Sequence, residues 1–243
     1  PQLREETSNG FTLGFTYSPN DQLSLALDGY RIDIDDRIVL TGRFDNQDPD
    51  IGSILNSLGV GQAQFFVNSV DTKTQGIDLT LSHTWAFDFG AQLVSYLGYN
   101  YSKTEVQAIN TPTRLRGRED VLLSERERLF IEQGAPRSKG VLSFDYSQDA
   151  WSGALKVIYF GTQNLGTFSG PPVPNQRYRA KTSADVSLSY SITPDLRAFA
   201  SLRLDTVAGA ANASSPLVRE RQGASAGVGF VYTLMSSKRP AFD

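Results

Sequence analysis

Apolar and polar residues alternate without interruption from Phe11 to Tyr17. The odd-numbered positions hold Phe, Leu, Phe and Tyr, whereas the positions between them hold Thr, Gly and Thr. Because successive side chains of a β-strand point to opposite faces, this pattern predicts a strand with one apolar and one polar face. Alternation resumes directly after the segment SPND at 18–21, which is typical of a tight turn. The start of the chain is therefore expected to form two strands joined by a hairpin.

The same alternation recurs along the chain and predicts about nine strands, with lengths near the ~9 to 11 residues of a tilted membrane strand or above. The alternating segments are 11–17, 23–27, 77–81, 89–101, 142–146, 151–159, 184–190, 198–204 and 226–234. The opposite face carries charged residues, which indicate contact with water: Asp28, Asp78, Lys156, Asp185, Arg197 and Arg203. A soluble sandwich also pairs an apolar with a polar face, so alternation alone does not distinguish it from a membrane barrel.

The apolar positions change parity within the second strand. They are odd-numbered from Leu23 to Leu27 and even-numbered from Tyr30 to Ile34. An extra residue in one strand of a pair restores a single apolar face. We therefore expect a β-bulge near Asp28-Gly29.

The connections between the expected strands alternate in length. Short turns fall at 18–21, 86–88, 147–150 and 193–195, and long connections at roughly 35–66, 107–135, 163–177 and 207–221. Connections that alternate between short and long are the signature of an up-and-down transmembrane barrel, with tight turns at one rim and extended loops at the other. In soluble domains, loops above ~12 to 15 residues without structure of their own are uncommon.

Aromatic residues flank the short turns, as expected for a girdle at the membrane interface. They are Tyr17, Trp85, Phe87, Tyr146, Trp151 and Tyr190. The alternative is that aromatic residues cap hairpins in any β protein. His83, the only histidine, is in phase with the apolar face and is interpreted as a girdle residue, because a single histidine has no partners for a metal or catalytic set.

One long connection also contains helix signals. Ser124 and Glu127 have the spacing of a capping box, and Gly134 followed by Pro136 supplies a stop. These residues predict a short helix over 125–133.

Composition excludes several classes of protein. The net charge of -3 does not suit a nucleic-acid surface, and the absence of cysteine excludes disulfides and thiolate sites. No run approaches the ~18 apolar residues of a transmembrane helix. We find no nucleophile elbow, phosphate loop or metal-ligand spacing, so the chain is expected not to be an enzyme and no cofactor is expected.

The candidate ligand-binding residues are Arg114, Arg116 and Arg118 in the second long connection. On an extension of a strand they would share one face and attract an anionic ferric chelate or a lipopolysaccharide phosphate. The alternative is an exposed, solubilising loop, because Glu119 and Asp120 follow directly.

Two acidic groups suggest a cation site, although their spacing lacks the glycine and distal glutamate of a calcium loop. Asp33, Asp35 and Asp36 fit a solvated strand end better. Hard-cation binding by Asp45, Asp48 and Asp50 in a loop is a possibility that the sequence leaves open.

Three segments, 3–42, 68–85 and 127–162, together resemble the C-terminal barrel portion of TonB-dependent outer-membrane receptors. The shared features are a Glu-Thr-Ser lead-in, the strand end YRIDIDDRI, the strand start TQGID and the loop exit Gly-Xaa-Pro-Arg, in this order. The resemblance implies an all-β, antiparallel, up-and-down transmembrane barrel. Residues 1–243 would be one part of it, with unpaired edge strands.

Receptors of this family have about 22 strands around a plugged lumen. The resemblance thus implies that about 13 strands, the plug domain and the TonB-contacting box lie upstream of this chain. It also implies an outer-membrane receptor that imports a scarce nutrient, most often a ferric siderophore, with energy from the TonB complex. Lipid and lipopolysaccharide would surround it, and no nucleic-acid partner is expected.

Two alternatives remain open. A passive porin or adhesin-type barrel lacks the plug and needs no TonB. A soluble carbohydrate-binding β protein predicts that the face of Leu13, Leu79, Leu188 and Phe230 is buried against a second layer.

Overall fold

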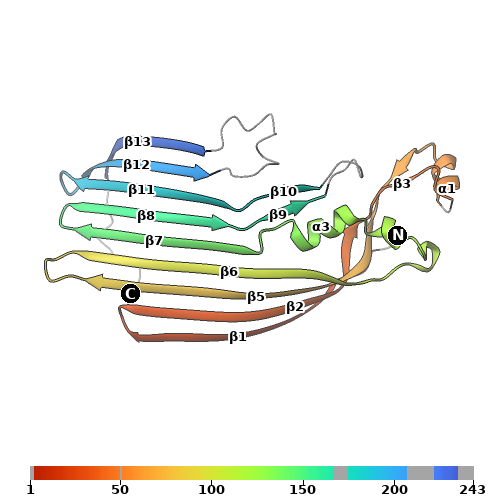
Figure 1. The fold of residues 1–243 in the computed structure, drawn as a ribbon, viewed down its shortest axis with the longest axis horizontal. Coiled ribbons are helices and arrows are strands. Elements are labelled where there is room, and N and C mark those ends of the chain that lie inside the picture. Colours follow the sequence, from red (N-terminus) through yellow and green to blue (C-terminus); the bar gives the residue numbers. More distant parts are fainter. Residues whose placement is uncertain (1–2, 50, 167–174, 207–221, 235–243) are drawn as a thin grey trace.

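Nine long strands form one antiparallel sheet in a computed structural model that describes residues 3–49, 51–166, 175–206 and 222–234 (Figure 1). The strands are β1 (Thr7–Asn20), β2 (Leu23–Leu40), β5 (Phe66–Ala86), β6 (Gln92–Ile109), β7 (Ser138–Gln148), β8 (Trp151–Phe160), β11 (Lys181–Ser191), β12 (Leu196–Thr206) and β13 (Gln222–Tyr232). Their order in the sheet is their order in the chain, so the sheet is an up-and-down meander. Within the described residues β1 and β13 are the two edges, and the barrel is not closed. The expected strand number and fold class are confirmed.

The connections alternate in length as expected. Tight turns join the strands at one end of the sheet, which we call the turn end. At the other end, the loop end, three long connections carry short elements: β3 (Phe44–Asp45), α1 (Gly52–Ser57) and β4 (Gln62–Ala63); η1 (Thr113–Leu115), α2 (Glu119–Leu122) and α3 (Glu125–Gln133); β9 (Gln163–Leu165) and β10 (Gln176–Tyr178). The fourth connection, 207–221, lies outside the described residues. The helix predicted over 125–133 is confirmed, and none of the described helices has the length and apolarity to cross a membrane.

The pairing register places most of the apolar residues of the nine strands on one side of the sheet, the apolar face. In one row Phe15 pairs with Leu27, which pairs with Leu79. This face is uncovered, because Leu13, Leu188 and Phe230 are 71%, 52% and 72% exposed. A second layer over it, which the soluble alternative requires, is absent from the described part of the chain.

Aromatic side chains of the apolar face contact one another at the turn end. The rings of His83 and Trp85 lie 4.1 Å apart, and those of Trp151 and Tyr190 lie 4.8 Å apart. The indole N–H of Trp85 donates a hydrogen bond of 3.1 Å to Ser95 Oγ. His83 therefore lies beside the tryptophan of the expected girdle, with an apolar body and a polar tip like its neighbour.

The opposite side of the sheet, the polar face, carries cross-strand polar pairs. Asn100 Nδ2 donates to Asp78 Oδ1 at 2.6 Å, and Arg203 lies 3.7 Å from Asp185 and 3.1 Å from Asp205. Because these pairs are only partly buried, each stabilises the sheet by about 1 kcal/mol or less. Their consequence is a water-compatible surface opposite the apolar face.

The bulge expected at Asp28-Gly29 is wrong. Gly29 pairs regularly with Leu13 on β1 and with Ile77 on β5, whereas the register shifts between Ile34 and Ile38, next to the positive φ of 54° at Asp36. The apolar positions of β2 change parity without an extra residue at this point in the strand. Near the loop end the apolar face becomes polar, and Tyr30 turns to the polar face, where its ring lies over Gly76, 2.3 Å from where a Cβ would be.

We predict that the two faces respond oppositely to a new charge. In the whole protein reconstituted in lipid vesicles, Val186→Arg on the apolar face should destabilise the barrel by about 2–4 kcal/mol, because lipid does not solvate the guanidinium. Ser187→Arg, one residue along on the polar face, is the matched control and should cost much less. Urea titration followed by tryptophan fluorescence measures both, and equal losses would contradict this assignment of faces.

Candidate functional site

The first two long connections share a small hydrophobic core at the loop end. Val70 and Leu122 are fully buried, and Val39, Val67 and Leu123 pack with them. Burial of a Val or Leu side chain contributes roughly 1.5–3 kcal/mol. This cluster therefore ties α2 to the ends of β2 and β5, so that these connections are held together.

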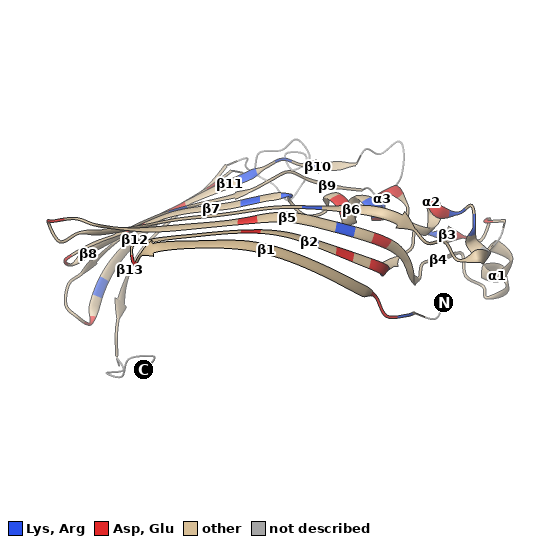
Figure 2. Ribbon diagram, turned by 90° about the horizontal axis from the view of Figure 1, so that it is seen from below, with Lys and Arg blue, Asp and Glu red and all other residues tan. Residues whose placement is uncertain are grey.

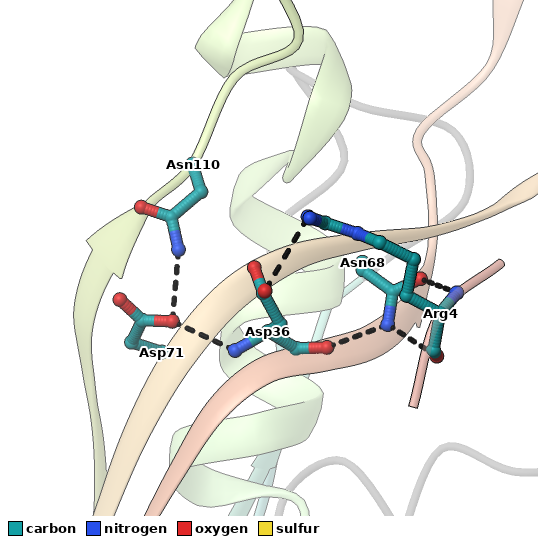
Figure 3. A network of polar contacts seen from close by, with 5 residues as sticks. All are labelled: Arg4, Asp36, Asn68, Asp71 and Asn110. Atoms are coloured by element: carbon teal, nitrogen blue, oxygen red, sulfur yellow. Dashed lines mark hydrogen bonds and ion pairs between the residues drawn. The ribbon is translucent and has the colours of Figure 1, made fainter. Parts of the chain in front are cut away.

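A polar network fastens the segment before β1 to the same region (Figure 3). The side chain of Asn68 accepts a hydrogen bond from the Arg4 N–H at 2.7 Å and donates to the carbonyls of Arg4 and Asp36, at 2.9 and 2.8 Å. Asp71 accepts from the Asp36 N–H at 2.9 Å and from Asn110 Nδ2 at 2.8 Å. An ion pair of 3.3 Å joins Arg4 to Asp36. The network satisfies the backbone at the bulge, where pairing with β5 is interrupted.

The first and second connections also approach each other through backbone. The Gly42 N–H donates to the Val121 carbonyl at 2.9 Å, and a Cβ on Gly42 would lie 2.6 Å from that oxygen. Any other residue at this position would force the two segments apart. Glycine is therefore required here by close approach rather than by its φ angle.

An ion pair between Asp48 and Arg118 adds a second link between these connections. The Asp48 side chain is 4% exposed and that of Arg118 is 23% exposed. A carboxylate at such burial needs a cation or donors, since an unpaired buried charge is costly. Arg118 is thus a structural residue that joins the two loops.

The helix α3 lies between β6 and the third connection. Its Glu132 accepts a hydrogen bond from the Val106 N–H at 3.0 Å, and its Gln133 accepts one from Asn164 Nδ2 at 2.5 Å. The predicted capping pair is in contact, but the Ser124 hydroxyl binds the Glu127 carboxylate and makes no side-chain cap bond to the backbone. Helix α3 therefore connects the second and third loops.

The three arginines predicted to bind a ligand do not share one face of a strand. Arg114 lies in η1, and its side chain is outside the described residues. Arg116 is exposed, whereas Arg118 is paired across the loops. Gly117, with φ of 82°, turns the chain between them. Arg116 and Arg114 remain candidates for contact with a ligand.

The surroundings of Arg116 are anionic on one side. The pKa of Glu119 lies below its ordinary value because the carboxylate accepts hydrogen bonds from two backbone N–H groups, its own and that of Gly117. The bond from the Gly117 N–H is 3.2 Å long. Glu119 therefore stays ionised at neutral pH and limits the positive potential of this loop.

Apart from Asp35, which is exposed, the described acidic residues considered as cation ligands make other contacts. Asp33 pairs with Arg31, Asp36 with Arg4, and Asp48 with Arg118. Asp45 Oδ1 accepts from the Gln47 N–H at 2.9 Å, and Asp50 lies outside the described residues. No group of three potential metal ligands occurs in the ranges that the structure describes. The structural contacts of Asn68 and Asp48 had no signal in the sequence, because their partners are far away along the chain.

We predict that loss of the interloop ion pair loosens both loops. Arg118→Ala leaves the Asp48 carboxylate buried without this partner, at a cost on the order of 3 kcal/mol in local stability. Hydrogen exchange in 41–49 and 118–123 of the whole protein should accelerate. Arg116→Ala removes an exposed arginine from the same loop and should leave these rates unchanged; acceleration in that variant to the same extent would refute the structural role of Arg118.

The network around Asn68 makes a second prediction. Asn68→Ala removes three hydrogen bonds at about 1 kcal/mol each, so the segment before β1 should detach locally with a loss of roughly 2–3 kcal/mol. Limited proteolysis at residues 3–6 reports this detachment. Asn110→Ala, which removes one bond to Asp71, is the control and should have a smaller effect.

Comparison with known proteins accounts for this architecture. A family model described as TonB dependent receptor-like, beta-barrel matches residues 1–211. No curated protein sequence matches the chain.

Three solved structures share the fold. The FrpB iron transporter from Neisseria meningitidis (F3-3 variant) is 17% identical, with a TM-score of 0.54 over 82% of this chain and 25% of that chain. The ferric-catecholate import receptor Fiu from E. coli K12 is 14% identical, with a TM-score of 0.55 over 83% of this chain and 23% of that chain. The copper transporter OprC is 15% identical, with a TM-score of 0.50 over 83% of this chain and 26% of that chain.

The present chain spans about a quarter of the length of each of these structures. Identities this low show the fold alone. The family model, in contrast, covers most of the chain, and its barrel agrees with the meander, the two faces and the alternating connections described above. The chain belongs to the TonB-dependent receptor-like β-barrel family.

Proposed function

We propose that the whole protein is an outer-membrane receptor that imports a scarce nutrient with energy from the TonB complex. The observation that carries the proposal is the family match over residues 1–211, combined with an uncovered apolar face that suits lipid contact. This family is a class of receptors and transporters, and we infer no catalytic activity.

A ferric siderophore is the cargo we favour. Two structures of the same fold are named as an iron transporter and a ferric-catecholate import receptor, although a third is named as a copper transporter. Capture would occur at the loop end, where the three connections are linked into one surface. Arg116 would attract an anionic chelate there, and Arg114 is retained as a candidate from the same loop.

We further propose that residues outside this chain complete the barrel and the transporter. The two open sheet edges need partner strands, and the similar structures are about four times as long as this chain. The remaining strands, a plug domain and the TonB-contacting segment would lie in that part. The polar face would then line the lumen around the plug.

Uptake measurements in the native bacterium test the transport proposal. Deletion of the gene should abolish uptake of one or more radiolabelled ferric siderophores, and deletion of tonB should abolish it equally. Uptake that depends on the gene but persists without TonB would indicate a passive porin. Unchanged uptake of every siderophore in a panel would refute iron transport.

The charge of the second loop yields a further prediction. Arg116→Glu should raise the KM for an anionic ferric chelate by roughly tenfold at low salt, because the new charge repels the ligand. Arg116→Lys keeps the charge and should preserve the KM. Surface protein must be equal in both strains by immunoblot, and an unchanged KM in the Glu variant would remove Arg116 from the capture surface.

A further inference from the structure

Charged residues on the apolar face are confined to one region of the sheet. The pairing register assigns to this face Arg31, Asp33 and Asp35 on β2, Lys73 on β5, and Lys103 and Glu105 on β6, all near the loop end. In Figure 2 charged bands are visible on β2 and β5 toward this end. In the described part of β7, β8, β11, β12 and β13, the positions on the apolar face are uncharged. This side of the sheet therefore has a local polar feature that a uniform lipid boundary does not require.

Apart from Asp35, which pairs with Thr7 on β1 just before the bulge, these residues and Gln75 form two rows across the strands. In the row next to the apolar residues, Arg31 pairs with Gln75, which pairs with Lys103, so every member has N–H donors and the formal charge is +2. In the next row outward, Asp33 pairs with Lys73 and Lys73 with Glu105. The row next to the apolar residues therefore carries donors and cations alone, whereas the outer row holds Lys73 between two carboxylates and has a formal charge of -1.

The carboxylates orient the cations without using all their donors. Asp33 accepts from Arg31 Nε at 2.7 Å and from Nη2 at 3.0 Å, and Glu105 accepts from Lys103 Nζ at 2.6 Å. A guanidinium has five N–H donors and an ammonium three, so both retain capacity for a second anion. The side chains of Arg31 and Lys103 are 52% and 39% exposed.

A hollow lies directly below the donor row. Gly29 separates Leu13 from Ile77 in the register, and only the Leu13 carbonyl, at 3.9 Å, comes within 4 Å of where a Cβ would be. The hollow has a volume of about 640 Å³, and its lining includes Phe11, Tyr101, Arg31 and Lys103. Glu105, the partner of Lys103, also lines it, so the hollow is apolar on the inner side and carries two cations and one of their carboxylates on the outer side.

We propose that this hollow binds an acylated membrane lipid that carries a phosphate monoester. One acyl chain would occupy the notch over Gly29, and the phosphate would accept hydrogen bonds from Arg31, Gln75 and Lys103. Adjacent strands lie about 4.8 Å apart, so Arg31 and Lys103 flank Gln75 at a spacing that long side chains can close around one phosphate. The proposal rests on the proposed membrane location, which places the donor row at the lipid boundary.

The charge order supports a lipid over other occupants. A cationic ligand would meet the positive row first, and a soluble anion would not fill the apolar notch. A phosphate attached to acyl chains matches both surfaces at once, with its negative charge at the edge of the apolar region. The outer carboxylates would then face water and hold the cations in place.

Native mass spectrometry of the purified whole protein in detergent tests the proposal. The probes are bisphosphorylated hexa-acyl lipid A and the same lipid after enzymatic removal of its phosphates. We expect retention of the phosphorylated probe at least tenfold above the dephosphorylated one. Gly29→Leu, which fills the notch, and the double variant Arg31→Gln/Lys103→Gln should each lose this preference, whereas Arg31→Lys should keep it.

Ala226→Leu, on the apolar face of β13, is the control for added bulk and should bind as the parent does. Each variant must show the parent's heat-modifiable mobility in gels, which establishes a folded barrel. Equal retention in all folded variants, equal retention of both probes, or displacement of the lipid by millimolar inorganic phosphate would overturn the proposal. Because binding is measured on purified protein, failure here is distinguishable from failure of siderophore uptake.

Discussion

The backbone hydrogen-bond ladder is the constraint on which the rest of this structure depends. In lipid no water satisfies an exposed N–H or carbonyl, so a spanning β segment must pair each strand along its length. Nine strands do so in chain order, and their register brings most apolar residues to one side. A shift of one residue in any pair would move that strand's apolar residues to the polar face. The membrane surface and the polar surface are therefore two consequences of a single register.

The loop end is held together by side-chain packing and polar links in place of a strand ladder. There the strands leave the apolar region, and short elements fold over one another around Val70 and Leu122. The ion pair between Asp48 and Arg118 is largely buried, unlike the charged pairs of the polar face. The proposed capture of a ligand there would gain from this arrangement, because linked loops lose less conformational entropy when a ligand binds. Arginines that look equivalent in the sequence thereby acquire different roles, one structural and one exposed.

Much of the fold was predictable because its signals are local. Alternation predicts strands such as β11, the segment SPND predicts the first turn, and helix α3 has a capping pair and a glycine-proline stop. The bulge was misplaced because a change of parity at Leu27 and Tyr30 has two explanations that sequence cannot separate. One is an extra residue; the other, found here, is a regular strand whose apolar face becomes polar at Arg31.

Local sequence patterns specify the all-β class, the strand number, the uneven connections and the resemblance to a receptor family, since each depends on neighbours within a few residues. Tertiary structure alone decided which distant residues meet. Asp48 and Arg118 are 70 residues apart, as the loops fold together, and Arg31, Gln75 and Lys103 form one row only in the observed register. Alternation specifies the face of each residue within its strand, whereas cross-strand pairing specifies its neighbours on that face.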